Sequence, residues 1–230
     1  AMTRRFSYSF VVCVILTLSF CLPTFGDQPA DRTPAPVMTF HGAEWLERSE
    51  REQEEMPSEV IKTMGLTPGD VVADIGCGTG YFSRRMAKAV APNGKVYANE
   101  IQPEFIEMLK VNCAKEGVTN YEAVLGAEDD PKLPKGGIDW ILLTDVFHEF
   151  QQPKPMLARM LESLKPDGKV ALIEYRLLGD TAKHIKEEHR MSVKQVLAEW
   201  NEAGFELVDL LEFLPSQHFF IFQRDPDRTK

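Results

Sequence analysis

The order of apolar and polar residues along the chain changes character near residue 38. Beyond this point, short apolar runs typical of buried strands alternate with longer stretches of helical periodicity. Strands are predicted at residues 71–75, 95–100, 121–125, 138–144, 168–175, 205–214 and 218–223, and helices at residues 43–64, 81–90, 103–116, 154–164 and 192–203. Pro57 is expected to divide the first helical stretch into two helices.

This alternation predicts an α/β fold with a doubly wound, mostly parallel, seven-stranded sheet that has helices on both faces. Only Pro215, Ser216 and Gln217 separate the last two strands, which is short enough for a hairpin. One antiparallel strand is therefore expected near the C-terminus. Ligands of such sheets bind at the carboxyl ends of the strands, where the strand order reverses.

The N-terminus carries a different pattern. Two arginines precede an uncharged, largely apolar run over residues 6–26, and the small residues Thr24 and Gly26 fit a cleavage site before Asp27. Residues 1–26 are therefore predicted to be a secretory signal peptide or, because the run is about long enough to cross a bilayer, a membrane anchor. Either role places the rest of the chain outside the cytoplasm, with membrane attachment only if the segment stays uncleaved.

Three further regions follow the leader. Residues 27–37 contain three prolines and no apolar periodicity, so they are predicted to be a linker. Residues 38–65 form a predicted helical cap, and residues 66–230 form the principal domain. If translation began at Met38 instead, the protein would be cytoplasmic.

Composition excludes several classes of protein. The chain has 230 residues, of which 43% are hydrophobic and 27% charged, so it can form a packed core. Its net charge of −9, with no basic patch, argues against nucleic acid as a partner. Four cysteines without a CxxC spacing predict neither a disulfide scaffold nor a zinc site.

The strongest chemical signal is the turn between residues 71–75 and the helix that follows. It contains Gly76, Gly78 and Gly80, which allow positive φ and close approach of a ligand, and it leads to the free N–H groups of a helix N-terminus. Glu100 ends the next strand, where a carboxylate can accept the ribose hydroxyls of an adenosine. A nicotinamide dinucleotide is disfavoured, because its motif requires Gly or Ala at the position of Tyr81.

The G-x-G-x-G spacing, with Asp74 two residues ahead of it, resembles motif I of the class I S-adenosylmethionine-dependent methyltransferases. The resemblance covers nearly all of residues 66–224. It implies a Rossmann-like fold, S-adenosylmethionine as cofactor and methyl transfer as the activity.

The same resemblance assigns residues to the cofactor by position. It implies cofactor contacts from Asp74, Gly76, Cys77, Gly78, Gly80, Glu100, Ile101, Glu128, Asp129 and Asp145. Asp74 would order the loop and help to hold the amino group, and Glu100 would bind the ribose. Ile101 would lie against the adenine, and Asp145 would face the methionine end and the acceptor.

Candidate catalytic residues follow the fourth strand. His148 has a near-neutral pKa and could act as a base beside Asp145, and Glu149 could orient it or face solvent. The alternative for His148 is a residue at a helix start that packs on the sheet. A metal site built from His148 with Glu174, His184 and His189 has no supporting ligand spacing, so no metal is predicted.

These features predict a methyltransferase that acts on a small-molecule acceptor. The alternative is a non-catalytic sensor or scaffold that binds S-adenosylmethionine or S-adenosylhomocysteine, since an exported enzyme would lack a supply of the cofactor. Within the helical stretch, Trp45 and Leu46 are expected first to pack in the core and second to wall a covered pocket. The charged run over residues 50–55 is expected to be a solvated face. The sequence specifies neither the atom methylated nor the oligomeric state.

Overall fold

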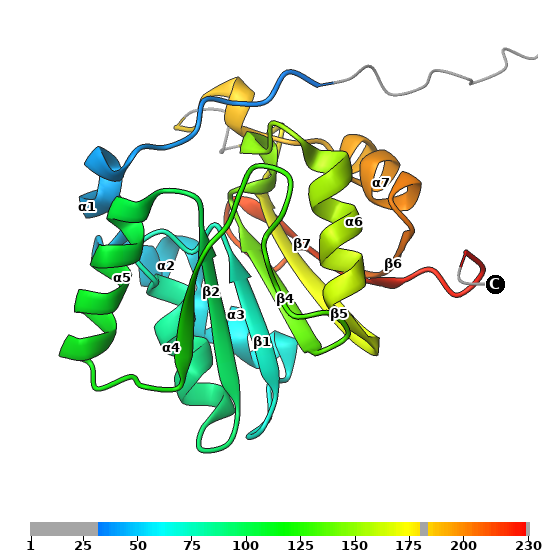
Figure 1. Ribbon diagram of the computed structural model, residues 1–230. Helices are drawn as coiled ribbons and strands as arrows, with labels where there is room; N and C mark the ends of the chain where they lie inside the picture. The colour runs from blue at the N-terminus through cyan, green and yellow to red at the C-terminus, as the bar shows by residue number, and fades with distance from the viewer. Residues whose placement is uncertain (1–31, 180–183, 229–230) are drawn as a thin grey trace, which may run out of the picture. The chain divides into compact units, whose positions relative to one another are not determined.

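A single seven-stranded sheet organises the protein, of which the computed structural model describes residues 32–179 and 184–228. The strand order is β3-β2-β1-β4-β5-β7-β6 (Figure 1). The strands are β1 (Val71–Ile75), β2 (Lys95–Glu100), β3 (Tyr121–Leu125), β4 (Ile138–Thr144), β5 (Leu164–Tyr175), β6 (Phe205–Leu211) and β7 (Gln217–Arg224). Strand β7 runs antiparallel to both β5 and β6, whereas the other neighbouring pairs are parallel. The predicted fold class is confirmed.

Helices cover both faces of this sheet. The α-helices are α1 (Ala43–Leu46), α2 (Arg51–Glu55), α3 (Pro57–Met64), α4 (Tyr81–Val90), α5 (Pro103–Lys115), α6 (Pro153–Ser163) and α7 (Val193–Glu202). Helices α3, α4 and α5 pack in one core cluster, and α6 and α7 pack in the other. Figure 1 shows α4 and α5 on one side of the sheet and α6 and α7 on the other.

The two core layers follow from the alternation of side chains along each strand. In β4, Leu142 joins the cluster of α3, α4 and α5, whereas Ile141 and Leu143 join the cluster of α6 and α7. Both sets are fully buried, which explains the almost continuous apolar run of this strand. The second cluster is rich in aromatic side chains, and Trp200 stacks on Phe222 with ring centroids 4.5 Å apart.

Most predicted element boundaries agree with the structure, but β5 begins four residues earlier than predicted, at Leu164, and β6 ends three residues earlier, at Leu211. The first helical stretch is divided at Pro57, as predicted, because Met56 adopts a left-handed conformation with φ of 47°. A second break after Leu46 was not predicted; there the Arg48 guanidinium donates to the carbonyl of Trp45. Helix α7 begins at the predicted cap, where the Gln195 N–H donates to the Ser192 hydroxyl over 3.1 Å.

An extended N-terminal segment, here called the strap (residues 32–39), packs against the domain. Arg32 donates to the carbonyl oxygens of Phe147 and His148 over 2.7 and 2.8 Å and pairs with Glu199. Ala35 is fully buried, and its N–H donates to the carbonyl of His148 over 2.9 Å. The described part of the predicted linker, residues 32–37, therefore belongs to the packed domain.

The predicted signal or anchor, residues 1–26, lies outside the described residues. Across the part of the chain that the structure describes, no helix has the length and apolar character needed to cross a membrane.

Candidate functional site

A cavity of about 350 Å³ opens at the carboxyl ends of the strands, where the order reverses between β1 and β4. This is the position expected for the ligand site of a doubly wound sheet. Its walls come from the turn after β1, the ends of β2, β4 and β5, the strap, α1 and α2, and the segment before α7. Trp45 and Leu46 contribute apolar wall, as the sequence suggested.

The glycine-rich turn fits tightly beneath this cavity. Gly76 and Gly78 have φ of 67° and 52°, which favours glycine. A Cβ on Gly76 would lie 2.4 Å from Val146, and one on Gly78 would lie 2.7 Å from Leu46. Gly76 therefore requires glycine for conformation and for space, and Gly78 requires it for conformation, since the end of the Leu46 side chain can move.

Asp74 anchors the turn from below. Its carboxylate accepts a hydrogen bond from the Ser83 hydroxyl over 2.6 Å, and the residue is 3% exposed. Burial raises the pKa of Asp74 to about 7, although the Ser83 hydrogen bond opposes the shift. The predicted role in ordering the loop is consistent with this contact.

Glu100 is held rigidly at the end of β2. Its Oε2 accepts the Gly78 N–H over 3.1 Å, and its Oε1 accepts the N–H groups of Ile101 and Gln102 over 2.7 and 3.0 Å. Burial raises its pKa, with the three N–H groups acting against the shift. Since a carboxylate oxygen has two acceptor positions, Oε2 keeps one for a ligand hydroxyl.

The end of β4 presents polar atoms that lack partners. Asp145 has φ of 51°, and its Oδ2 accepts from the Gln217 amide over 3.2 Å. Its Oδ1 and the Thr144 hydroxyl are buried and have no hydrogen-bond partner, although both residues line the cavity. Burial raises the pKa of Asp145 well above its usual value, and the nearby Glu55 and Glu174 add to the shift.

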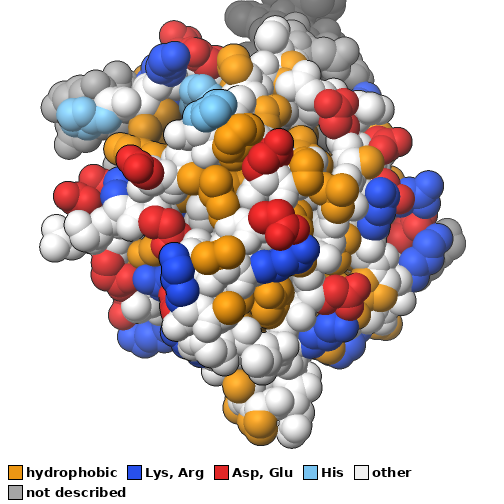
Figure 2. Space-filling view, turned by 60° about the vertical axis from the view of Figure 1, so that its left-hand side comes forward, with side chains coloured by type: hydrophobic (Ala, Val, Ile, Leu, Met, Phe, Trp, Pro, Cys, Tyr) orange, Lys and Arg blue, Asp and Glu red, His pale blue; other side chains and the backbone are white. Residues whose placement is uncertain are grey.

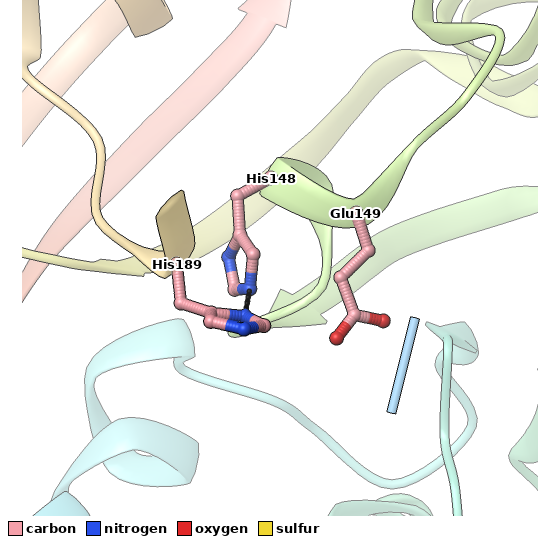
Figure 3. A group of neighbouring side chains, drawn as sticks. All are labelled: His148, Glu149 and His189. Atoms are coloured by element: carbon pink, nitrogen blue, oxygen red, sulfur yellow. Dashed lines mark hydrogen bonds between the residues drawn. The ribbon is translucent and has the colours of Figure 1, made fainter. Parts of the chain in front are cut away.

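A carboxylate–imidazole–imidazole chain forms the far end of the cavity. Glu174 Oε2 lies 2.6 Å from His148 Nδ1, and His148 Nε2 lies 3.1 Å from His189 Nδ1. Figure 3 shows the two rings edge to face, with the Glu149 carboxylate beside them. Glu174, which is fully buried, orients His148, whereas Glu149 accepts the N–H of Met38 in the strap.

The charged groups around His148 and His189 shift the pKa values of both imidazoles and of Glu149. Burial lowers the pKa of His148, but the adjacent Glu174 outweighs it, so the net direction is upward. Burial and the neighbouring His148 lower the pKa of His189. Burial raises the pKa of Glu149 to about 7. His148 lies in a short 3-10 turn (Phe147–Glu149), close to the predicted helix start.

Other predicted site residues divide into two groups. Cys77, Ile101 and Glu128 line the cavity, but Gly80 and Asp129 do not. A Cβ on Gly80 would instead lie 2.2 Å from Leu109, so this glycine allows α5 to pack against the turn.

Among the cavity residues that the sequence missed is a buried ion pair. Arg51 and Glu55 are only 6% and 4% exposed, so the expectation of a solvated face over residues 50–55 was wrong for these two side chains. They form an ion pair of 2.7 Å, and the Arg51 guanidinium lies over the Tyr81 ring. Their helical spacing of four residues was the one available signal.

Comparison with known proteins identifies the family of the chain. A family model described as a methyltransferase domain matches residues 66–213. The chain belongs to this methyltransferase family. Among solved structures, the methyltransferase domain is similar to an S-adenosylmethionine-dependent methyltransferase of Aquifex aeolicus, with a TM-score of 0.77 and 25% identity over 81% of this chain and 98% of that one.

Curated relatives of this methyltransferase have different acceptors in their names. A protein-L-isoaspartate O-methyltransferase of Pyrococcus horikoshii is 33% identical over 56% of this chain and 56% of that protein. A mitochondrial ubiquinone biosynthesis O-methyltransferase of Schizosaccharomyces pombe is 28% identical over 71% of this chain and 60% of that protein. The chain thus spans little more than half the length of these relatives, and they do not identify its acceptor.

S-adenosylmethionine is the cofactor of this methyltransferase family, and the cavity fits it. The cofactor carries positive charge on its sulfonium and amino groups. Six carboxylates line the cavity against two cationic side chains, Arg51 and Lys186; the acidic residues are Glu55, Asp74, Glu100, Glu128, Asp145 and Glu149. The unpartnered Asp145 and Thr144 oxygens add acceptors that a bound amino group or hydroxyl can satisfy.

Proposed function

We propose that the protein transfers the methyl group of S-adenosylmethionine to a small-molecule acceptor enclosed in the cavity. One observation carries the proposal: a single cavity joins the glycine-rich turn and Glu100 to Asp145 and His148. The residues proposed to hold the cofactor and the titratable side chains of Asp145 and His148 therefore line one enclosed space. Such an arrangement favours an aligned reaction over simple ligand storage.

The residues divide the work between cofactor and acceptor. The bound cofactor supplies a methyl group on a positively charged sulfur. The turn over residues 76–78 and Glu100 hold it, and Asp74 pairs with its amino group. Asp145, with an open Oδ1 and a raised pKa, accepts the proton that the acceptor loses.

His148 lies at the opposite wall of the cavity. Its Nε2 is engaged by His189, so this nitrogen is not free to take a proton in the observed arrangement. We therefore assign the proton to Asp145 and assign His148, with both ring nitrogens engaged, to shaping the acceptor end of the cavity.

The nature of the acceptor rests on the surface and the enclosure. Figure 2 shows Lys and Arg side chains scattered among acidic ones over one face, with no broad basic area there. The cavity is covered by the strap and α1, with Met38 and Trp45 in its wall. These features support a small molecule as acceptor and argue against nucleic acid.

Calorimetric titration with S-adenosylmethionine, S-adenosylhomocysteine and NAD tests the cofactor, with Glu100→Ala as control. Binding of the first two ligands, lost in the control, is the expected result. A screen for transfer of labelled methyl groups to pooled hydroxyl, amine and thiol compounds then tests catalysis, with Asp145→Asn as control. Binding without transfer to any acceptor class would favour the non-catalytic sensor or scaffold instead.

We further propose that residues 1–26 export or anchor the protein and that residues 66–230 form the methyltransferase domain. The support is the charged start and apolar run of the leader. Cell fractionation of the full chain with a C-terminal tag tests this proposal. Recovery of the full-length protein in the cytosol would refute it.

A further inference from the structure

His148, Glu149 and His189 bring three potential metal ligands to one place. One donor atom from each lies within 4.8 Å of the other two. Figure 3 shows His148 and Glu149 on adjacent positions of one turn and His189 facing them from a separate short turn (Glu187–His189). His148 and His189 are 41 positions apart in the sequence, so the cluster has no short ligand spacing by which it could be recognised.

The distance between the two imidazoles suits a shared cation. A tetrahedral ion with metal–nitrogen bonds of about 2.0–2.1 Å separates two ligand nitrogens by roughly 3.3 Å. His148 Nε2 and His189 Nδ1 are already 3.1 Å apart. Replacing their shared proton by a cation therefore changes the nitrogen–nitrogen distance by only a few tenths of an ångström, while both rings turn so that their lone pairs point at the ion.

Glu174 provides the support that a metal-binding histidine needs. Imidazole ligands usually donate their second N–H to a carboxylate, which fixes the ring and its tautomer. His148 Nδ1 lies 2.6 Å from the carboxylate of Glu174, and this leaves Nε2 as the ligand atom. Glu174 is fully buried and also accepts the backbone N–H of Phe147 over 2.7 Å, so the ring is held in place without a cation.

The cluster also has the charge and the opening of a catalytic site. All three residues line the cavity, so a cation held by three protein ligands keeps a position open toward the acceptor. The carboxyl groups of Glu149, Glu174 and Asp145 lie close to His148, and the cationic Lys186 is exposed. Two imidazoles and one carboxylate favour zinc-like cations over magnesium or calcium.

We propose that His148, Glu149 and His189 bind one divalent transition-metal ion of the zinc class at the acceptor end of the cavity. Binding itself does not depend on methyl transfer. Its use in catalysis rests on the proposed function: the open position would take an oxygen atom of the acceptor, and Asp145 would receive the proton. His148 would then activate the acceptor through the ion.

Titration of the full-length, metal-free protein with Zn²⁺, followed by calorimetry, tests the site, and Co²⁺ absorption reports the ligand geometry. We expect one ion per chain with micromolar or tighter affinity, and visible Co²⁺ bands of low coordination number. His189→Ala and Glu149→Gln should each weaken binding at least tenfold. Glu174→Gln should weaken it 10–100-fold, the usual effect of losing an outer carboxylate.

His218→Ala is the matched control, because His218 pairs with Glu212 and does not line the cavity. It should bind Zn²⁺ like the unmodified protein. Absence of saturable binding at 100-fold excess, or equal affinity in His189→Ala, would overturn the proposal. Binding that survives in the two ligand variants but is lost in Cys77→Ser would also overturn it. S-adenosylmethionine titration of the same samples shows separately whether the cofactor site is intact.

Discussion

Replacement of Gly80 by alanine tests whether the third glycine of the turn serves packing and not the cofactor. Gly80 has φ of 82°, and a Cβ there would lie 2.2 Å from the Cδ1 atom of Leu109, a fully buried side chain of α5. The left-handed conformation costs alanine about 1–2 kcal/mol. Overpacking against Leu109 adds about 1–3 kcal/mol. We therefore expect Gly80→Ala to lower the free energy of unfolding by about 2–5 kcal/mol.

Gly136→Ala separates the two contributions. Gly136 has φ of 64° and no atom within 4 Å of an added Cβ, so this variant carries the conformational cost alone. We expect it to lose about 1–2 kcal/mol. In a Leu109→Val background, which removes the clashing Cδ1, Gly80→Ala should cost no more than Gly136→Ala.

Urea unfolding followed by tryptophan fluorescence measures these differences, with the slope on denaturant checked for two-state behaviour. Because Gly80 does not line the cavity, folded Gly80→Ala should keep its affinity for S-adenosylmethionine, whereas Gly78→Ala should lose it. Equal destabilisation by Gly80→Ala and Gly136→Ala would refute the packing argument. A selective loss of cofactor binding in Gly80→Ala would show that the glycine serves the cofactor directly.

Four further predictions concern charged groups of the site and of the strap. Since the pKa of Asp74 is raised to about 7, its carboxyl group is neutral below that pH. The affinity for S-adenosylmethionine, measured by calorimetry, should therefore fall by up to tenfold per pH unit below pH 7. The same pH profile in Asp74→Asn would contradict this. Because the pKa of Asp74 is raised in the folded state, the folded protein is favoured at low pH, and this contribution to stability is lost as the pH rises through 7. In urea unfolding, Asp74→Asn should therefore stabilise the cofactor-free protein more at pH 8 than at pH 5. Arg32→Ala removes two charged hydrogen bonds to carbonyls and should cost about 1–3 kcal/mol, with an unchanged urea midpoint as the opposing result. Glu174→Gln should lower the pKa of His148 in an NMR titration, because Glu174 is what holds that pKa up against burial.

The cofactor side of the site was predictable because it is built from contiguous sequence. The strand at residues 71–75, the turn after it and Glu100 at the next strand end are each set by local pattern and by the parallel pairing of β1 with β2. The same local rules gave the sheet, the two helical layers and the cap at Ser192. Even here, the motif does not reveal that an added Cβ on Gly80 would meet Leu109 of α5.

The arrangement of the acceptor side could not be predicted, although its residues were named as candidates, because it is assembled from segments far apart in the chain. Glu174 ends an apolar strand and reaches back to the turn that carries His148, while His189 arrives from the segment before α7. Arg51 and Glu55 resemble a solvated pair in sequence, yet they are buried. They pair with each other, and Arg48 and the Leu46 carbonyl satisfy their remaining groups. Their burial depends on tertiary packing, and the only sign of it in the sequence is their spacing of four residues on one helix.

This division has a physical consequence for how the protein can vary. The cofactor side is held largely by backbone N–H groups and glycines, so side-chain changes there act through conformation and space. The acceptor side is held by contacts from the strap, from Glu174 of β5 and from His189 in the turn at residues 187–189. Substitutions in those three segments can reshape the acceptor end while the bonds that fix Glu100 and Asp74 stay in place. Acceptor choice should therefore depend on the segments whose contacts span the longest stretches of sequence.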